Sequence, residues 1–193
     1  ADPHVHRDVV DLTLQHAEVL AGLTLSQAAR PGCPFAYGAA SSVSSMQSGQ
    51  VMMGVPQFWQ LTAATVELAS FLGLPSRAGG SLTDAHVADM QAGVEGGLSL
   101  AASLTSGASL ILHGTGVLSS LNALSFAKFM VDDETIGMLR AAMAAIDVRD
   151  ETIALDVLKR VGSQGSFLAQ PHTRRHSRDW AGGSCFNRHS YDR

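Results

Sequence analysis

The most constraining feature of this sequence is one stretch, residues 76–95, with the sequence SRAGGSLTDAHVADMQAGVE. Its first residues predict a short strand, the glycine pair predicts a turn, and the remainder predicts a helix. Ser81, Thr83 and Asp84 are residue types that cap the free N–H groups at a helix start, and Asp84 also suits the positive end of the helix dipole. A strand that leads through a turn into a helix is the unit from which α/β proteins are built.

Two stripes run along the predicted helix. One is apolar, at three- and four-residue steps, and consists of Val87, Met90, Val94, Leu98 and Ala101. The other is polar and consists of Asp84, Gln91 and Glu95. A polar stripe beside a buried face, below a glycine-rich strand end, is where an α/β protein places a site. The alternative is a helix cap and a solvated edge, which is the favoured interpretation for Gln91 alone.

The rest of the chain repeats this alternation, and Pro56 marks one helix start, where proline is favoured. Besides the 76–95 stretch, whose helix is expected to end near Gly107, apolar spacing and turn residues define the other elements. Helices are predicted at residues 9–30, 56–72, 125–146 and 152–161, strands at 33–40, 108–113 and 166–169, and a polar loop at 41–49. This order implies a parallel sheet with right-handed crossovers, with too few units to close an eight-stranded barrel.

Composition indicates one globular domain over residues 1–193. Of the 193 residues, 46% are hydrophobic and 16% are charged, and the net charge of −4 gives no footprint for nucleic acid. Cys33 and Cys185 lie far apart, which favours a reducing compartment. No apolar run long enough for a transmembrane helix and no signal peptide are recognised, so we expect a cytoplasmic protein without membrane contact. The polar and basic residues 177–193 predict an irregular tail.

Two candidate site residues stand at predicted strand ends. Tyr37 ends the strand at 33–40, and the C-terminal ends of parallel strands face the ligand in α/β folds. His113 ends the strand at 108–113 and can be a general acid or base, a ligand, or a hydrogen-bonded structural residue. The functional and structural interpretations of His113 are equally favoured.

The histidines elsewhere in the chain give a weaker signal for a metal site. His172 and His176 are four residues apart, as in a zinc-binding helix, but Thr173 stands where a metalloprotease helix has glutamate. A structural or substrate-contacting role is therefore favoured. A metal-dependent hydrolase using His113, His172 and His176 remains the alternative. His4 and His6 are interpreted as part of a terminal tail.

Several short motifs, in order and with their spacing, resemble the trimethylamine methyltransferase family over almost the whole chain. They are Arg30-Pro31-Gly32, Tyr37-Gly38, Gly73-Leu74-Pro75, Thr83-Asp84-Ala85, Asp89 to Glu95, Ser125, Lys128-Phe129, Asp132 to Glu134 and His172-Thr173. The resemblance implies a (β/α)8 TIM barrel, of which this chain covers roughly the later half. It also implies transfer of a methyl group from a quaternary or tertiary amine, such as trimethylamine or glycine betaine, to the cobalt of a corrinoid on a separate small protein.

Three residues depart from the family pattern near the expected barrel mouth. Ser45 stands where the family has an acidic residue, Gln57 where it has glutamate, and His86 where it has lysine. Members that act on trimethylamine carry pyrrolysine, which this sequence lacks. These departures favour a betaine-like substrate or a diverged relative.

The chemistry assigns roles to the candidate residues, because a methyl donor with a cationic nitrogen must be held and aimed. Aromatic faces and carboxylates hold cations, which predicts a binding role for Tyr37 and a catalytic one for Asp84 and Glu95. His113 would protonate a tertiary amine. The further predicted substrate contacts are Gln91, His86, His172 and Thr173, with Arg174 as another donor for a betaine carboxylate.

The same interpretation sets expectations for cofactors and partners. No cofactor or metal is expected on this chain itself, since the corrinoid arrives with its own protein. An incomplete barrel leaves two open sheet edges, which favours pairing with another chain, and we expect a homo-oligomer. A non-catalytic fragment of the same family stays open as an alternative.

Overall fold

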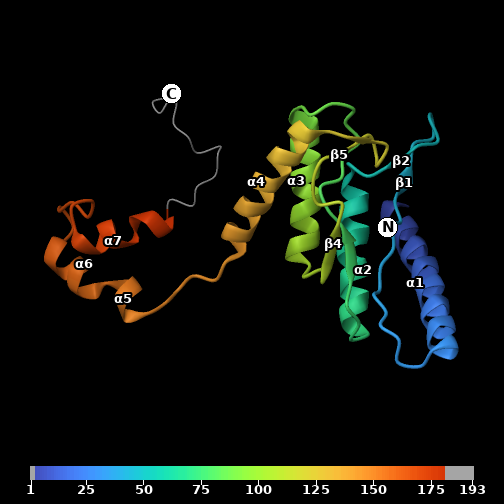
Figure 1. The fold of residues 1–193 in the computed structure, drawn as a ribbon, viewed down its shortest axis with the longest axis horizontal. Helices are drawn as coiled ribbons and strands as arrows, with labels where there is room; N and C mark the ends of the chain where they lie inside the picture. The colour runs from blue at the N-terminus through green and yellow to red at the C-terminus, as the bar shows by residue number, and fades with distance from the viewer. Residues whose placement is uncertain (1–2, 181–193) are drawn as a thin grey trace. The chain divides into compact units, whose positions relative to one another are not determined.

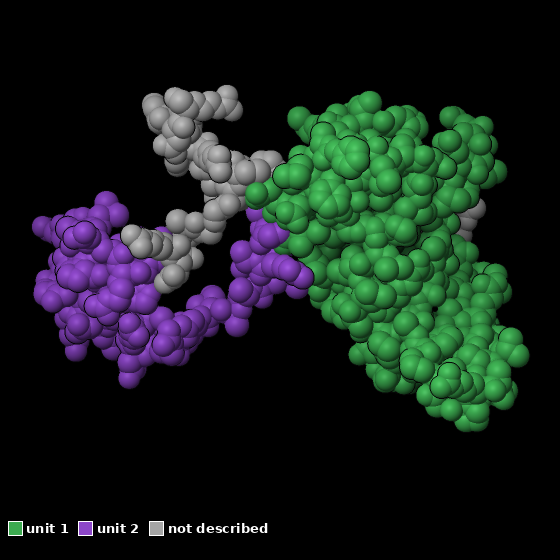
Figure 2. Space-filling model, viewed as in Figure 1, with its two compact units in different colours: residues 1–136 green, residues 137–193 purple. Residues whose placement is uncertain are grey.

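A computed structural model describes residues 3–180 of the chain, with side chains described from Val9 to Ser177. The chain divides into two compact units, Ala1–Ile136 and Gly137–Arg193, which Figure 2 distinguishes by colour. Helix α4 (Phe126–Met143) begins in unit 1 and ends in unit 2.

Unit 1 is built on three short parallel segments. Tyr37 forms a parallel bridge with Ser76, and β3 (Arg77–Gly79) pairs in parallel with β4 (Leu110–Leu112), with Arg77 opposite Leu110. Helix α2 (Pro56–Phe71) connects the first segment to the second, and α3 (Met90–Thr105) connects the second to the third. The predicted α/β alternation is therefore confirmed. The described residues close no barrel, and a partial TIM barrel stays a prediction.

Three helices of unit 1 lie side by side in the order α1 (Pro3–Ala29), α2 and α3 (Figure 1). Helix α2 begins at Pro56, as predicted, because a residue in the first turn needs no N–H donor. Its inward face buries Phe58, Leu61, Val66 and Ala69, and the core continues through Met53, Leu82 and Val117. No described helix is long and apolar enough to cross a lipid bilayer.

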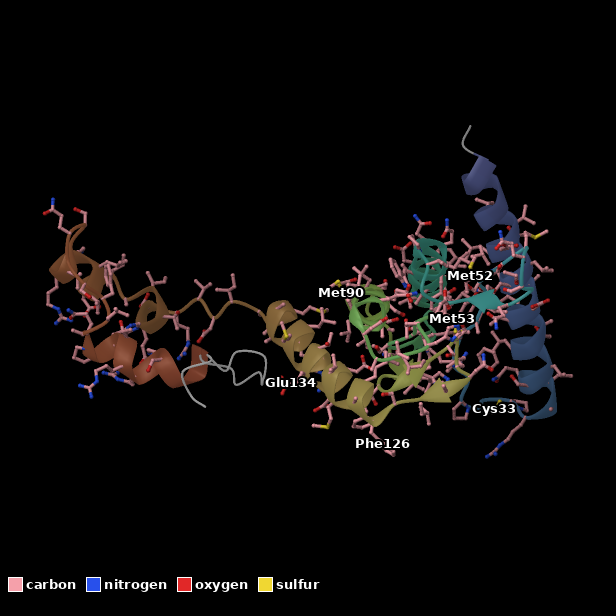
Figure 3. All side chains as sticks on the ribbon, turned by 90° about the horizontal axis from the view of Figure 1, so that it is seen from above. Cys33, Met52, Met53, Met90, Phe126 and Glu134 are labelled. Carbon is pink, nitrogen blue, oxygen red and sulfur yellow. The ribbon has the colours of Figure 1, made fainter. Side chains whose placement is uncertain are left out.

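The predicted start and apolar face of α3 are wrong. The helix begins at Met90, where Asp89 caps it by accepting a hydrogen bond from the Ala92 amide at 3.0 Å. The predicted stripe is exposed instead: 61% of Val87, 84% of Met90, 55% of Val94 and 47% of Leu98. The buried face consists of Ala92, Gly96, Ser99, Leu100 and Ser103. Figure 3 labels Met90 on α3 and Phe126 at the start of α4, and Phe126 is 95% exposed.

Small residues face the sheet because α3 lies very close to it. A Cβ atom added at Gly96 would lie 2.2 Å from the Ser81 hydroxyl oxygen, and the Ser103 hydroxyl donates to the carbonyl of Gly79 at 2.5 Å. Large apolar side chains would hold the helix further from the strands. The spacing of large residues therefore identified the wrong face of this helix.

Two antiparallel hairpins flank the C-terminal ends of the parallel segments. The first pairs β1 (Val43–Ser44) with β2 (Val51–Met52), and the second pairs β5 (Val117–Leu118) with β6 (Ala123–Leu124). The first hairpin includes much of the predicted loop at 41–49, and the strand predicted at 33–40 reduces to the bridge at Tyr37. The turn of the second hairpin holds three successive left-handed residues, Ser119, Ser120 and Leu121, with φ of 51°, 50° and 75°.

Unit 2 contains the C-terminal end of α4 and the short helices that follow it. These are α5 (Asp150–Ile153), α6 (Leu155–Val161) and α7 (Pro171–Trp180). The helix predicted at 152–161 is interrupted at Ala154, whose φ is 50°, and residues 166–169 form no strand. Helix α7 includes residues 177–180, which were predicted to be irregular, while residues 181–193, including Cys185, lie outside the described part.

Candidate active site

Asp84 joins three loops at the C-terminal end of β3. Its Oδ1 accepts hydrogen bonds from the Met53 amide at 2.8 Å and the Ser120 hydroxyl at 2.6 Å. Its Oδ2 accepts from the Gly54 amide at 3.0 Å. One carboxylate thus connects the loop after β3, the segment after β2 and the turn between β5 and β6. Asp84 does not cap α3, because its oxygens are used in these tertiary contacts.

Glu95 lies directly beside Asp84. Its Oε2 accepts from the Thr83 hydroxyl at 2.7 Å and from the Asp84 amide at 2.9 Å, and its Oε1 accepts from the Gln91 side chain at 2.8 Å. A Cβ atom at Gly54 would lie 2.1 Å from Glu95 Oε2, so only glycine fits there without a shift. The structure therefore brings together three of the predicted site residues, Asp84, Gln91 and Glu95.

The donors around this pair, here called the carboxylate cluster (Asp84 and Glu95), are all neutral: backbone amides, hydroxyls and one amide side chain. In the part of the chain whose side chains are described, every ion pair involves other acids. Hydrogen bonds from neutral donors stabilise an ionised carboxylate without cancelling its charge. The carboxylate cluster consequently presents net negative charge at the end of the strands.

A second polar group lies nearby and was missed by sequence reasoning. Here called the ion-pair network, it consists of Ser81, Lys128 and Asp132, and each is at most 2% exposed. Lys128 Nζ lies 2.7 Å from Asp132 Oδ2 and donates to the Ser81 hydroxyl at 2.6 Å. Asp132 belongs to the acidic run Asp132 to Glu134, and it is buried although three consecutive acids on a helix usually form a solvated face. The i, i+4 spacing of Lys128 and Asp132 was the available signal, but it is also that of an ordinary surface pair.

Tyr37 is buried in unit 1 and contacts helix α1. Its ring is 0% exposed, and its hydroxyl lies 2.8 Å from His16 Nδ1 on α1. Burial raises the pKa of the Tyr37 hydroxyl above its ordinary value. In this structure the ring presents no face to solvent, so the predicted cation contact has no access.

The two histidines predicted in unit 1 are exposed near the same strand ends. His86 Nδ1 lies 2.8 Å from the Ser119 hydroxyl in the turn of the β5–β6 hairpin. His113 follows β4 with a left-handed φ of 55°, and its carbonyl accepts a hydrogen bond from the Ser81 amide at 3.0 Å. The backbone of His113 thus has a structural role, and proton transfer by its side chain stays a prediction.

His172 and Thr173 belong to unit 2. With Phe167, His176 and Ser177 they line a hollow of about 400 Å³, in which the His172 and His176 rings lie 4.6 Å apart. His172 Nε2 lies 2.7 Å from the carbonyl of Glu151, and His176 Nε2 lies 3.7 Å from the Glu151 carboxylate. Among the described residues no three His, Cys, Asp or Glu side chains form a potential metal site.

Comparisons with known proteins agree on one family. The family model described as trimethylamine methyltransferase matches residues 9–182. The chain is 41% identical to a glycine betaine methyltransferase of Desulfitobacterium hafniense over 182 residues, which is 94% of this chain and 38% of that protein. It is 38% identical to an L-carnitine:corrinoid methyltransferase of Eubacterium limosum over 175 residues, 89% of this chain and 36% of the relative.

A third relative is a trimethylamine methyltransferase of Methanosarcina barkeri. It is 36% identical over 163 residues, which cover 84% of this chain and 33% of the relative. The chain therefore spans about a third of the length of the curated relatives it matches.

Proposed function

Because the chain belongs to the trimethylamine methyltransferase family, we propose that it contributes to methyl transfer from a quaternary amine to the cobalt of a corrinoid on a separate protein. The resemblance predicted from the motifs is confirmed, and the methyltransferase names of the relatives support the proposed activity. Glycine betaine is the proposed class of substrate, since a relative of that name is 41% identical to this chain. The name of the carnitine relative supports the corrinoid acceptor.

The observation that carries this proposal is the uncompensated charge of the carboxylate cluster. Asp84 and Glu95 are held in place by neutral donors, so their negative charge is available to a cation. A quaternary ammonium group has no N–H to donate, and charge attraction must hold it. At about 4 Å such an attraction is worth roughly 1 kcal/mol in bulk water and ~4 kcal/mol near a protein surface.

The proposed task of these residues is to position the cation. In the proposed transfer the carbon–nitrogen bond would break with the nitrogen keeping its electron pair, and the cobalt of the separate corrinoid protein would supply the pair that binds the methyl carbon. A quaternary amine leaves as a neutral tertiary amine, so the nitrogen needs no proton. This agrees with carboxylates whose oxygens are already engaged as hydrogen-bond acceptors and therefore serve in orientation and electrostatics. A tertiary amine substrate would require an acid, and His113 is the proposed one.

The polar rim beside the carboxylate cluster offers contacts for the other end of a betaine. His86 Nδ1 and the Ser119 hydroxyl lie 2.8 Å apart. His86 is two residues after Asp84, and Ser119 is adjacent to Ser120, whose hydroxyl donates to Asp84. Their hydroxyl and ring nitrogen suit a carboxylate. The predicted contacts of His172 and Thr173 belong to unit 2 and stay part of the proposal.

The test compares glycine betaine with its carbon isostere, 3,3-dimethylbutanoate, by titration calorimetry against the full chain. The two ligands have the same shape and carboxylate and differ in the positive charge of the quaternary centre. We expect saturable binding of glycine betaine and at least tenfold weaker binding of the isostere, a difference of about 1.4 kcal/mol. Equal affinities would contradict a site that recognises the cation, and so would the absence of binding by glycine betaine, carnitine and trimethylamine alike.

A further inference from the structure

The Lys128 ammonium group is fully engaged although it is buried. Lys128 Nζ contacts Asp132 Oδ2 at 2.7 Å, the Ser81 hydroxyl at 2.6 Å and the Ser81 carbonyl at 3.1 Å. These contacts use all the donors that a lysine ammonium possesses. Both sides of Ser81, its main chain and its side chain, are thus fixed to α4.

Asp132 extends this attachment to the second hairpin. Its Oδ1 accepts from the Ser81 hydroxyl at 2.6 Å, and its Oδ2 accepts from the Gly116 amide at 2.7 Å. Gly116 directly precedes β5, whose hairpin turn carries Ser120, the hydroxyl donor to Asp84. Asp84 itself follows Ser81 within the same loop. The ion-pair network therefore fixes both the loop that carries Asp84 and the hairpin that binds it.

Glu95 is connected to the same network through its neighbour in sequence. A Cβ atom at Gly96 would lie 2.2 Å from the Ser81 hydroxyl oxygen and 3.1 Å from Lys128 Nζ. Helix α3 therefore contacts the ion-pair network directly at the residue after Glu95. All the chain segments that supply the carboxylate cluster meet Ser81, Lys128 or Asp132.

Stability alone does not account for such a pair. Two charges removed from water lose hydration, and well-packed apolar replacements of buried pairs are often neutral or stabilising. What apolar side chains cannot reproduce is direction, because the hydrogen bonds of Lys128 and Asp132 set the orientation of Ser81 and Gly116. We propose that Lys128 and Asp132 are positioning residues, which set the geometry of the Asp84–Glu95 cluster without contacting the substrate. That the positioned cluster serves substrate binding rests on the proposed function. That Lys128 and Asp132 position it rests on the contacts given above.

The test measures amide hydrogen exchange by NMR in the full chain, without substrate. The Met53 and Gly54 amides, which donate to Asp84, report on the carboxylate cluster, and the Val66 amide in α2 is the internal control. In the double variant Lys128→Met/Asp132→Leu, which leaves no unpaired charge, we expect a cooperative melt. We expect exchange at Met53 and Gly54 to be at least tenfold faster than in the wild type, with Val66 changed less than twofold.

A milder variant keeps the test decisive if the double variant does not fold. Ser81→Ala leaves the direct contact between Lys128 and Asp132 but removes the hydroxyl that links them to the loop of Asp84. We expect exchange at Met53 and Gly54 to rise at least threefold, and glycine betaine to bind at least fivefold more weakly, with the melting profile retained. In either folded variant, exchange at Met53 and Gly54 within twofold of the wild type would overturn the inference. Wild-type protein that binds no amine would overturn the proposed function instead, and the exchange result would still decide the positioning role.

Discussion

Asp84 and Asp132 accept nearly the same set of hydrogen bonds, but the charge of Asp84 is uncompensated and that of Asp132 is neutralised. Each accepts one serine hydroxyl and one backbone amide, from Ser120 and Met53 or from Ser81 and Gly116. The remaining donor of Asp84 is another backbone amide, whereas that of Asp132 is the Lys128 ammonium. A difference in one hydrogen-bond donor therefore distinguishes the charged, partly exposed carboxylate of Asp84 from the neutralised, buried carboxylate of Asp132. Hydrogen-bond geometry alone therefore does not identify a binding site, because the charge of the donors also decides whether a carboxylate attracts a cation.

The largest expected effect on stability comes from disrupting the neutralised pair of Lys128 and Asp132. Lys128→Met leaves Asp132 charged and buried, which we expect to reduce the free energy of unfolding by about 3–5 kcal/mol. Asp84→Asn, at the partly exposed site, should cost only about 1–2 kcal/mol. Urea unfolding followed by circular dichroism measures both. The exposed neighbour variant Asp133→Asn is the control and should change stability by less than ~0.5 kcal/mol. Equal costs for Lys128→Met and Asp84→Asn would remove the distinction.

The next largest effect tests how closely helix α3, which carries Glu95 of the carboxylate cluster, packs against the ion-pair network. Gly96→Ala should destabilise the chain by about 1–3 kcal/mol, because the added methyl overlaps the Ser81 hydroxyl at 2.2 Å. Gly93→Ala is the matched control on the same helix, since nothing lies within 4 Å of its added Cβ. Alanine's better helix propensity should stabilise that variant by up to ~1 kcal/mol. Thermal unfolding of the two variants should thus shift in opposite directions, and parallel shifts would contradict the close approach.

A smaller effect concerns ligand binding at the charged side. Asp84→Asn should weaken glycine betaine about tenfold, roughly 1.4 kcal/mol, because one of two negative charges is lost. Asp133→Asn removes the same charge from an exposed position and should change the affinity less than twofold. Calorimetry at low and high salt adds a second criterion, since attraction at a partly exposed site weakens as ionic strength rises. Affinity that ignores both the variant and the salt would indicate that the cluster does not hold the cation.

The smallest effect uses a buried group that carries no charge at neutral pH. Burial raises the folded-state pKa of Tyr37, so the folded protein binds a proton that the unfolded chain releases above about pH 10. Its contribution to stability is complete below that pH and is lost as pH rises through the folded-state pKa. Tyr37→Phe should therefore flatten the decline of unfolding free energy in alkaline solution. At neutral pH it should cost about 0.5–1.5 kcal/mol, for the bond to His16. An unchanged alkaline decline in Tyr37→Phe would contradict this.

Parts of the fold followed from local sequence signals. The alternation of strands and helices was predicted because apolar runs and turn residues are read locally, and Pro56 marked a helix start for a reason confined to one turn. The structure brings together Asp84, Gln91 and Glu95, which the sequence placed on one polar stripe, and their role stays a prediction. Because these residues follow the same predicted strand within a short stretch of sequence, their proximity could be predicted from sequence order.

The errors arose where distant partners decide the outcome. Asp84 is a favourable helix cap in isolation, but amides of Met53 and Gly54 claim its oxygens, so the helix starts later, at Asp89. The exposed stripe with Val94 has the stronger apolar pattern, yet the close approach at Gly96 selects the face with small residues. Lys128 was overlooked because its burial depends on Ser81, forty-seven positions earlier. Periodicity does not contain such information.

The left-handed turn at Ser119, Ser120 and Leu121 has a consequence for how this sequence can change over time. L-residues in that backbone region each cost about 1–2 kcal/mol, and glycine would remove most of the cost. At Ser120 glycine would also remove the hydroxyl that Asp84 accepts, while at Leu121 it would remove a side chain that is 44% exposed. Selection for stability alone would drive all three positions toward glycine. Selection for the site would spare Ser120, which binds Asp84, and Ser119, which belongs to the proposed carboxylate contact. The substitution pattern of this turn among descendants therefore records which of the two pressures acted.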